Sequence, residues 1–258
     1  MKNKPVNSLS LYLRFEREAE KEIFSDWSTL LNSYKKGFNA FSSSVDFLTK
    51  NSAQNIEHFN QFMIIVIMNR LIGTIQSLRA LTLKGYYYEA CVLQRNFLES
   101  LGLCAYLADN PEKISLILKH NRLDISSSGL FRYTQRIFSK EKDEHLNEIT
   151  VKLYGTLCDY VHGNLNATLK GLSVEVDDLE GKVDGQSSLG LNLKLPSDPD
   201  VDKVSELSLF PLIAILGLLY CYDGVLSPKQ RKKLLNVVHK EFLVIANFQL
   251  SAYQRIRK

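Results

Sequence analysis

Residues that interrupt helices are scarce in this chain of 258 residues, which has only six prolines and thirteen glycines. Because proline and glycine are the residues least compatible with a helix interior, their scarcity favours long helices. Hydrophobic residues make up 45% of the chain and charged residues 23%. This composition supports a sizeable buried core and excludes a disordered chain. At this length we expect one large domain, or one domain with an appended hairpin.

The sequence also lacks paired cysteines and clustered histidines. It has no C-x-x-C motif, and no histidine has metal-ligand spacing to another. We therefore expect no structural zinc cluster and predict no metal or other cofactor. Each cysteine lies in an apolar helical pattern, which indicates reduced, buried thiols in a cytoplasmic protein. The cysteines are Cys91, Cys104, Cys158 and Cys221, and the histidines are His58, His120, His145, His162 and His239.

Uninterrupted apolar runs of membrane-spanning length are missing. Residues 62–75 are strongly apolar but contain Asn69 and Arg70, and residues 209–222 lie between Glu206 and Asp223. A helix that crosses a bilayer needs about twenty apolar residues. We therefore predict that both runs are core helices of a soluble, cytoplasmic protein with no membrane partner. The first residues of the chain have no apolar stretch typical of a signal peptide.

Apolar residues recur with helical spacing over most of the chain. Gly85 is placed to end one helix in the left-handed conformation, so that an antiparallel hairpin follows. Ser227-Pro228-x-Gln230 has the pattern of a capping box at a helix start. The serines at 42–44 mark a place where the first helix could fray or kink. The predicted helices cover residues 8–50, 53–83, 86–108, 111–120, a short stretch after 129, 142–169, 200–224 and 228–257.

Residues 171–195 have a different pattern, in which apolar and polar residues alternate on both sides of a polar, glycine-bearing stretch. This pattern predicts a small β-hairpin-like insertion. The fold predicted for residues 1–258 is a single all-α domain, a helical bundle of six to eight helices with this insertion. Residues 200–257 are predicted as a C-terminal helical pair.

Common catalytic motifs are absent. The sequence has no G-x-x-x-x-G-K-[ST], G-x-G-x-x-G, H-E-x-x-H or G-x-S-x-G. Phosphate-loop, dinucleotide-binding, zincin and esterase functions therefore have no support from motifs.

Four polar residues on two predicted helices are candidates for chemistry. Arg95 and Glu99 lie one turn apart on the helix 86–108, and Asp159 and His162 lie near the end of "LYGTLCDYVHGN". If these two helices are neighbours, the four side chains converge. Arginine would then bind a phosphate and histidine would transfer a proton near neutral pH. A ribonuclease that acts through the 2′-hydroxyl needs these two roles and no metal.

A structural interpretation of the same residues stays open. Arg95 has mostly apolar neighbours along its helix, and a buried guanidinium needs a partner. Arg95 and Glu99 would then form an ion pair that fixes helix register. His162 would cap a helix end before Gly163, where the helix dipole favours a cation.

Positive charge is concentrated at the C-terminal end. Residues 225–258 contain eight lysines and arginines but only one acid, Glu241. Such a segment can bind a phosphate backbone, although a solvated helix face is the alternative. Aromatic residues for base stacking are not interleaved with the charges. The candidate nucleic-acid-binding residues are Lys229, Arg231, Lys232 and Lys233.

The segment "GYYYEACVLQRNFLES" (85–100), together with the downstream "LYGTLCDYVHGN" (153–164), resembles bacterial and archaeal helical proteins of unknown function related to the HEPN superfamily. The resemblance covers a core of about residues 53–170. It implies a helical bundle that dimerises. Many HEPN proteins are metal-independent ribonucleases in toxin–antitoxin, anti-phage or RNA-processing systems, and others are non-catalytic.

The active HEPN pattern has arginine, a polar residue, four to six further residues and histidine on one helix. Arg95-Asn96 matches its beginning, but Ser100, Leu101 and Gly102 occupy the positions for histidine. Either His162 substitutes from another helix, or the chain is an inactive, binding-type member.

Two hypotheses follow. The first is a HEPN-like protein that binds or cleaves RNA by metal-independent acid/base chemistry in a defence or stress system. It would be an endoribonuclease if the second helix supplies the histidine. The alternative is a non-catalytic helical module for interaction or dimerisation. The expected partners are RNA, a second copy of the chain and a protein partner.

Overall fold

The segments with helical periodicity in the sequence form helices in the described part of the structure. The computed structural model describes residues 8–52, 59–120, 123–141, 144–161 and 201–256. These residues form nine helices and no strand, so the all-α class is confirmed. The predicted insertion at 171–195 lies outside the described residues. The helices are α1 (Ser8–Asp26), α2 (Ser28–Ser52), α3 (Phe59–Leu83), α4 (Tyr87–Asp109), α5 (Lys113–His120), α6 (Ser127–Glu141), α7 (Glu144–Val161), α9 (Val201–Cys221) and α10 (Pro228–Ile256).

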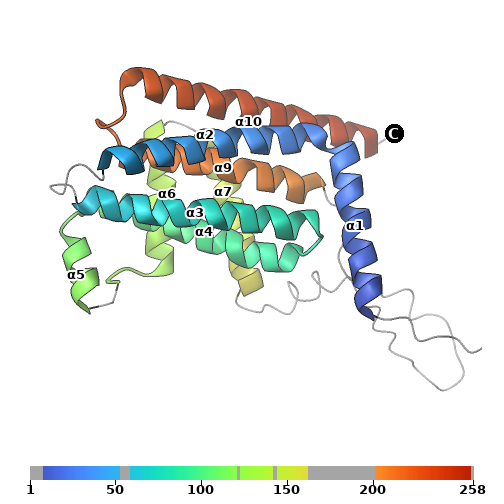
Figure 1. Ribbon diagram of the computed structural model, residues 1–258, viewed down its shortest axis with the longest axis horizontal. Helices are drawn as coiled ribbons and strands as arrows, with labels where there is room; N and C mark the ends of the chain where they lie inside the picture. Colours follow the sequence, from blue (N-terminus) through green and yellow to red (C-terminus); the bar gives the residue numbers. More distant parts are fainter. Residues whose placement is uncertain (1–7, 53–58, 121–122, 142–143, 162–200, 257–258) are drawn as a thin grey trace, which may run out of the picture.

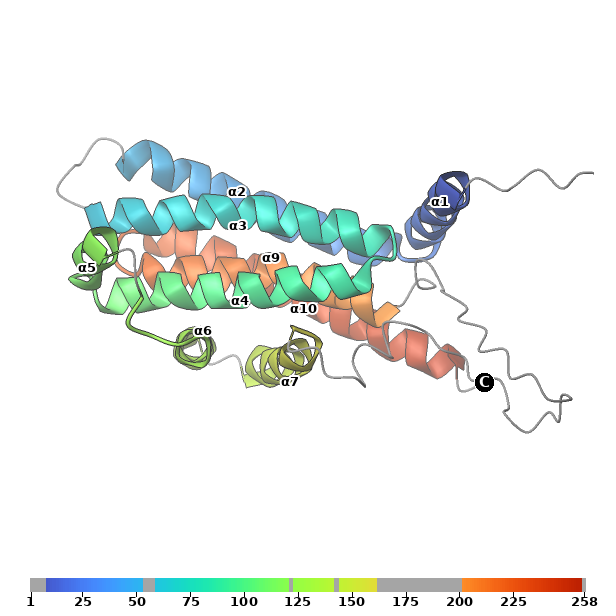
Figure 2. The ribbon, with the colours of Figure 1, turned by 90° about the horizontal axis from the view of Figure 1, so that it is seen from below.

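Five long helices lie alongside one another and form the bundle: α2, α3, α4, α9 and α10 (Figure 1). Helix α9 is central, since it contacts α2, α3, α4, α6 and α10. Helices α6 and α7 lie side by side across the outer side of α4 (Figure 2). Helix α1 projects at one end of the bundle, and α5 lies at the other end (Figure 1).

Within the described part of the chain, two helices are long and apolar enough to cross a membrane by length and composition alone, Asn60–Leu83 and Val201–Cys221. The two differ in burial, with 83% of the apolar window buried in α9 but only 33% in α3. Helix α9 is therefore a core helix, as predicted. Helix α3 buries one face only, and Phe62 and Val66 on its other face are 44% and 45% exposed.

The first predicted helix is wrong in one respect. It breaks at Trp27 into α1 and α2, which is why the described residues contain one helix more than the six to eight predicted. The serine run at 42–44 does not interrupt α2. The hydroxyl of Ser44 donates to the carbonyl oxygen of Ala40 at 2.8 Å, within the same helix. Hydroxyls that bond back to the preceding turn are compatible with a helix interior.

The predicted turn signals are confirmed. Gly85 has a φ of 81°, and the amide of Tyr86 donates to the carbonyl oxygen of Leu81 at 2.9 Å. This left-handed cap joins α3 and α4 into the expected antiparallel hairpin. At the start of α10, the amide of Gln230 donates to Ser227 Oγ at 3.3 Å, and the Ser227 amide donates to Gln230 Oε1 at 2.9 Å. Short helix α5 begins at Lys113, two residues after the predicted start.

Two glycines allow close contact of α4 with its neighbouring helices. A Cβ at Gly217 of α9 would lie 2.4 Å from Leu101 Cδ1 of α4. A Cβ at Gly102 of α4 would lie 2.0 Å from the backbone carbonyl oxygen of Leu130 in α6. Because glycine has no Cβ, α9 and α6 both approach α4 more closely than larger residues would permit.

Candidate functional site

The helices that carry Arg95, Glu99 and Asp159 are neighbours, because α4 contacts α7. Arg95 Nε on α4 donates to Glu99 Oε1 at 2.8 Å. The hydroxyl of Tyr154 on α7 donates to the same oxygen at 3.2 Å. The ring of Tyr154 in turn stacks on Phe131 of α6, with ring centroids 3.7 Å apart. Glu99 therefore forms a polar link between α4 and α7.

Burial and the Glu99 carboxylate together shift the pKa values of Arg95 and Tyr154. The side chains of Arg95 and Glu99 are only 11% and 18% exposed. Burial by itself would lower the pKa of Arg95, but the hydrogen bond and charge of Glu99 outweigh it, and the pKa is raised. Burial, with the nearby Glu99 carboxylate, also raises the pKa of Tyr154. At neutral pH Arg95 is therefore charged and the phenol of Tyr154 is protonated, and both donate to Glu99.

The remaining two predicted residues are only partly located. Asp159 lies on α7 beyond Tyr154, within the described helix, but its side chain is outside the described residues. His162 is itself outside the described residues. The structure therefore brings together Arg95 and Glu99, and the convergence of all four side chains stays a prediction.

Two of the three positions that could hold histidine in the active HEPN pattern are packed against other helices, namely Leu101 and Gly102. Ser100 is half-buried, and Leu101 is 0% exposed. Gly102 lies against the backbone of α6, where even a Cβ would come within 2.0 Å of a carbonyl oxygen. A histidine at position 102 would not fit this helix contact.

The predicted nucleic-acid-binding residues lie in the first two turns of α10, and we call Lys229, Arg231, Lys232 and Lys233 the basic cluster of α10. Its three lysines are exposed, and none has an ion pair within the part of the chain that the structure describes. Arg231 differs, because its Nη1 lies 3.0 Å from Asp223 Oδ1 and donates to the carbonyl oxygen of Leu219 at 3.3 Å. Arg231 thus stabilises the C-terminal end of α9.

Sequence analysis missed a second group of cations, on α6. Arg132, Arg136 and Lys140 are exposed and lie four residues apart, so they form one row along the helix. We call them the basic row of α6. The signal was present in "FRYTQRIFSK", since the spacing i, i+4, i+8 places residues on one helix face.

Among the described residues, no three metal-ligating side chains are grouped. All cysteines among the described residues are free thiols. Burial raises the pKa of Cys91 to about 11, so its thiol is protonated at neutral pH.

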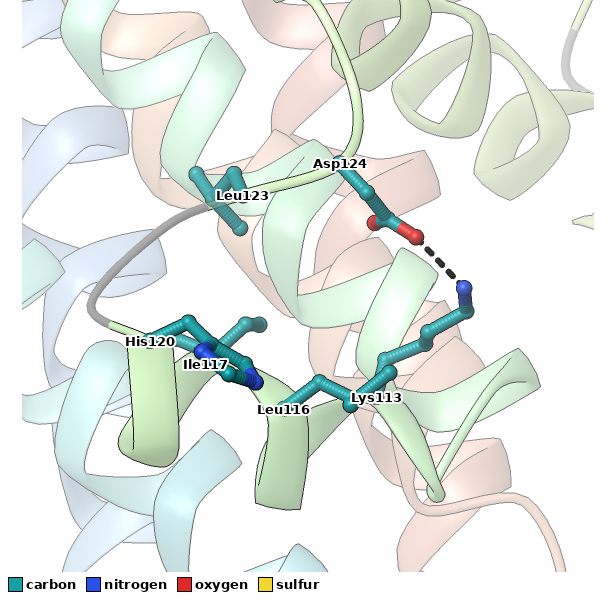
Figure 3. A pocket seen from close by; sticks show the side chains of 6 residues that line it. All are labelled: Lys113, Leu116, Ile117, His120, Leu123 and Asp124. Carbon is teal, nitrogen blue, oxygen red and sulfur yellow. Dashed lines mark hydrogen bonds and ion pairs between the residues drawn. The ribbon is translucent and has the colours of Figure 1, made fainter.

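A pocket of about 360 Å³ lies between α5 and the loop that precedes α6 (Figure 3). Lys113 and Asp124 at its rim form an ion pair, and the hydroxyl of Tyr106 donates to Asp124 Oδ1 at 2.6 Å. The hydrogen bond from Lys113 lowers the pKa of Asp124. Because these charges satisfy each other, the pocket is a weaker candidate than the basic surfaces. Its lining residues are Lys113, Leu116, Ile117, His120, Leu123 and Asp124.

Comparison of the chain with protein-family models, with curated proteins and with solved structures finds no match.

Proposed function

We propose that the protein binds RNA through the basic cluster of α10 and is a binding-type relative of the HEPN proteins that it resembles. The observation that carries this proposal is the position of the cluster at the start of a helix. Four cations occupy the first six residues of α10, and no acid is present in its first turn.

Helix energetics does not account for this placement. The N-terminus of a helix carries a partial positive charge, so acids there stabilise the helix and cations do not. Lys229 and Lys233 are also like charges at i, i+4, which destabilise each other. An anionic ligand offsets both costs, because it is attracted by the lysines and by the helix terminus. Lysines on an exposed surface suit the phosphate backbone of RNA.

In this proposal Arg95 has a structural role. Its guanidinium is mostly buried, and the Glu99 carboxylate that binds it also accepts the Tyr154 hydroxyl. An arginine held in this way fixes α4 against α7. This arrangement agrees with the structural interpretation of the Arg95–Glu99 pair.

Fluorescence anisotropy with a labelled single-stranded RNA tests the proposal. Exchange of Lys232 and Lys233 for glutamine removes two phosphate contacts, so the Kd should rise and the log–log salt slope should fall by roughly 1.4. The control exchanges the exposed Lys35 of α2 and Arg70 of α3 for glutamine, which removes the same charge elsewhere. The Kd and the salt slope of this control should stay close to those of the wild type. Equal binding by both double variants would contradict the proposal. Absence of RNA binding by the wild type would favour the non-catalytic interaction module.

A second candidate function, metal-independent RNA cleavage, is supported by the contact of α4 with α7 at Tyr154. Glu99, the ion-pair partner of Arg95, accepts this hydrogen bond from α7, the helix that also carries Asp159. The test compares cleavage of RNA by the wild type and by His162→Ala, with matched circular dichroism spectra. Cleavage lost in His162→Ala would support an endoribonuclease, and equal cleavage by both proteins would exclude this role for His162.

A further inference from the structure

The basic row of α6 resembles the basic cluster of α10 in one respect, since both place like charges four residues apart on a helix. Arg136 and Lys140 are 59% and 41% exposed, and Arg132 is exposed as well. Successive members are separated by four residues, a rise of about 6 Å along the helix. Like charges at this spacing destabilise a helix. Asp109 and Asp223 pair with Arg136 and Lys140, and Lys140 lies in the last turn of α6, where the helix dipole favours a cation. Arg132 has no ion pair among the described residues, so it is the member of the row most open to an added anion.

The two basic groups meet at Asp223, in the turn between α9 and α10. Lys140 Nζ lies 2.8 Å from Asp223 Oδ2, and Arg231 Nη1 lies 3.0 Å from Asp223 Oδ1. One carboxylate thus joins the last turn of α6 to the first turns of α10. Asp109 and Asp223 pair with three of these seven cations, namely Arg136, Lys140 and Arg231. Arg132 and the three lysines of the basic cluster are exposed.

The aromatic rings beside the row are covered by its cations. Arg136 Cζ lies 4.3 Å from the ring centroid of Tyr133, and Lys140 Nζ lies 4.8 Å from that of Tyr220. The Tyr220 hydroxyl also donates to Asp109 Oδ2 at 2.8 Å. Cation–π contacts hold the two cations in place and leave these ring faces unavailable for base stacking.

We infer that the basic row of α6 and the basic cluster of α10 form one continuous surface that binds the phosphate backbone of RNA without reading its bases. The inference rests on the proposed function and extends it, because α6 becomes half of the binding surface. Binding should therefore depend on charge and salt but not on sequence.

The test uses the full chain and two labelled RNA duplexes of about 20 base pairs with unrelated sequences, at salt concentrations from about 50 to 200 mM. The first variant combines Arg132→Gln with Lys140→Gln. Each lost phosphate contact lowers the log–log slope of affinity against salt by about 1, so this variant should lower the slope by about 2. Arg132→Gln alone, which breaks no ion pair among the described residues, should lower it by about 1.

The control is Lys35→Gln with Arg70→Gln, which removes the same charge from α2 and α3. If the α6 variants match this control while Lys232→Gln with Lys233→Gln weakens binding, the inference is overturned and the proposed function stands. A loss confined to one of the two sequences also overturns it, because it would indicate base reading. No salt-dependent binding by the wild type overturns both. Tighter binding to a matched DNA duplex would support the surface but overturn the assignment to RNA.

Discussion

Single residues decide how closely α4 and α6 pack. A side chain at Gly102 meets the carbonyl oxygen of Leu130 at 2.0 Å, and a backbone atom cannot move aside as the end of a side chain can. Gly102→Ala should therefore destabilise the protein by about 1–3 kcal/mol, the usual cost of overpacking. The measurement is the free energy of unfolding in urea.

Gly155 of α7 provides a matched control for this prediction. It is exposed, and a Cβ there has no neighbour within 4 Å. Gly155→Ala should stabilise the protein by about 0.5–1 kcal/mol, because alanine restricts the unfolded chain and favours a helix. Equal changes in the free energy of unfolding for the two substitutions would contradict a close contact between Gly102 and the backbone of α6.

The Arg95–Glu99 pair should contribute to stability because it is mostly buried. Glu99→Gln keeps the size of the side chain but removes the charge that faces Arg95, and should cost about 1.5–3 kcal/mol. Arg14 and Glu18 form an ion pair with the same spacing and the same 2.8 Å distance, but their side chains are 74% and 56% exposed. Glu18→Gln should leave the urea midpoint nearly unchanged. A similar midpoint shift for both variants would contradict the structural role.

The sequence predicted part of this residue-scale picture. Spacing at i, i+4 was sufficient to pair Arg95 with Glu99, because such residues are neighbours on any helix. The third member, Tyr154, depends on how α7 crosses α4, and the order of residues along the chain does not determine this crossing. The cations of α6 were missed for a different reason, since their helical spacing was visible but their connection to α10 passes through Asp223.

At the scale of elements, local signals predicted the helix ends that have strong capping chemistry. Gly85 and Ser227 both act as expected, because a left-handed glycine and a capping box are short-range interactions. The break at Trp27 was missed because no proline or glycine marks it. The turn between α1 and α2 depends on where α1 contacts the rest of the molecule.

That contact should depend on pH. The Tyr86 hydroxyl donates to Glu16 Oε1 at 2.6 Å and Lys84 Nζ lies 3.1 Å from Glu16 Oε2, so Glu16 connects α1 to the α3–α4 hairpin. The hydrogen bond from Tyr86 lowers the pKa of Glu16 below 4.5. The stabilisation is therefore complete above pH 4.5, the ordinary value, and is lost as the pH falls through the lowered pKa.

Trp27 is the only tryptophan and lies between α1 and α2, so its fluorescence reports on this contact. In the wild type the emission should change as the pH falls below 4.5, the ordinary value for this carboxyl group. Glu16→Gln should show the changed emission already at neutral pH and little further change on acidification. An acid transition of full size in the variant would mean that other groups control α1.

At the scale of the whole molecule, the sequence predicted the class because composition and periodicity are global properties. One hydrophobic core has buried residues from all nine described helices, including Ile23 of α1 and Ile114 of α5. Heating at neutral pH should therefore give one cooperative transition, with circular dichroism and Trp27 fluorescence changing at the same temperature. Two separate transitions of comparable size in circular dichroism would indicate that the core divides.

Leu101 and Gly102 are consecutive on α4 but contact different helices. The side chain of Leu101 packs against Gly217 of α9, and Gly102 lies against the backbone of α6. These two contacts should constrain the sequences of homologous chains in different ways. A larger residue at 217 can be accommodated by a shorter one at 101, so these two positions should covary. Position 102 has no such compensation, because a main-chain carbonyl cannot be shortened, and it should remain glycine wherever the packing of α6 on α4 is retained.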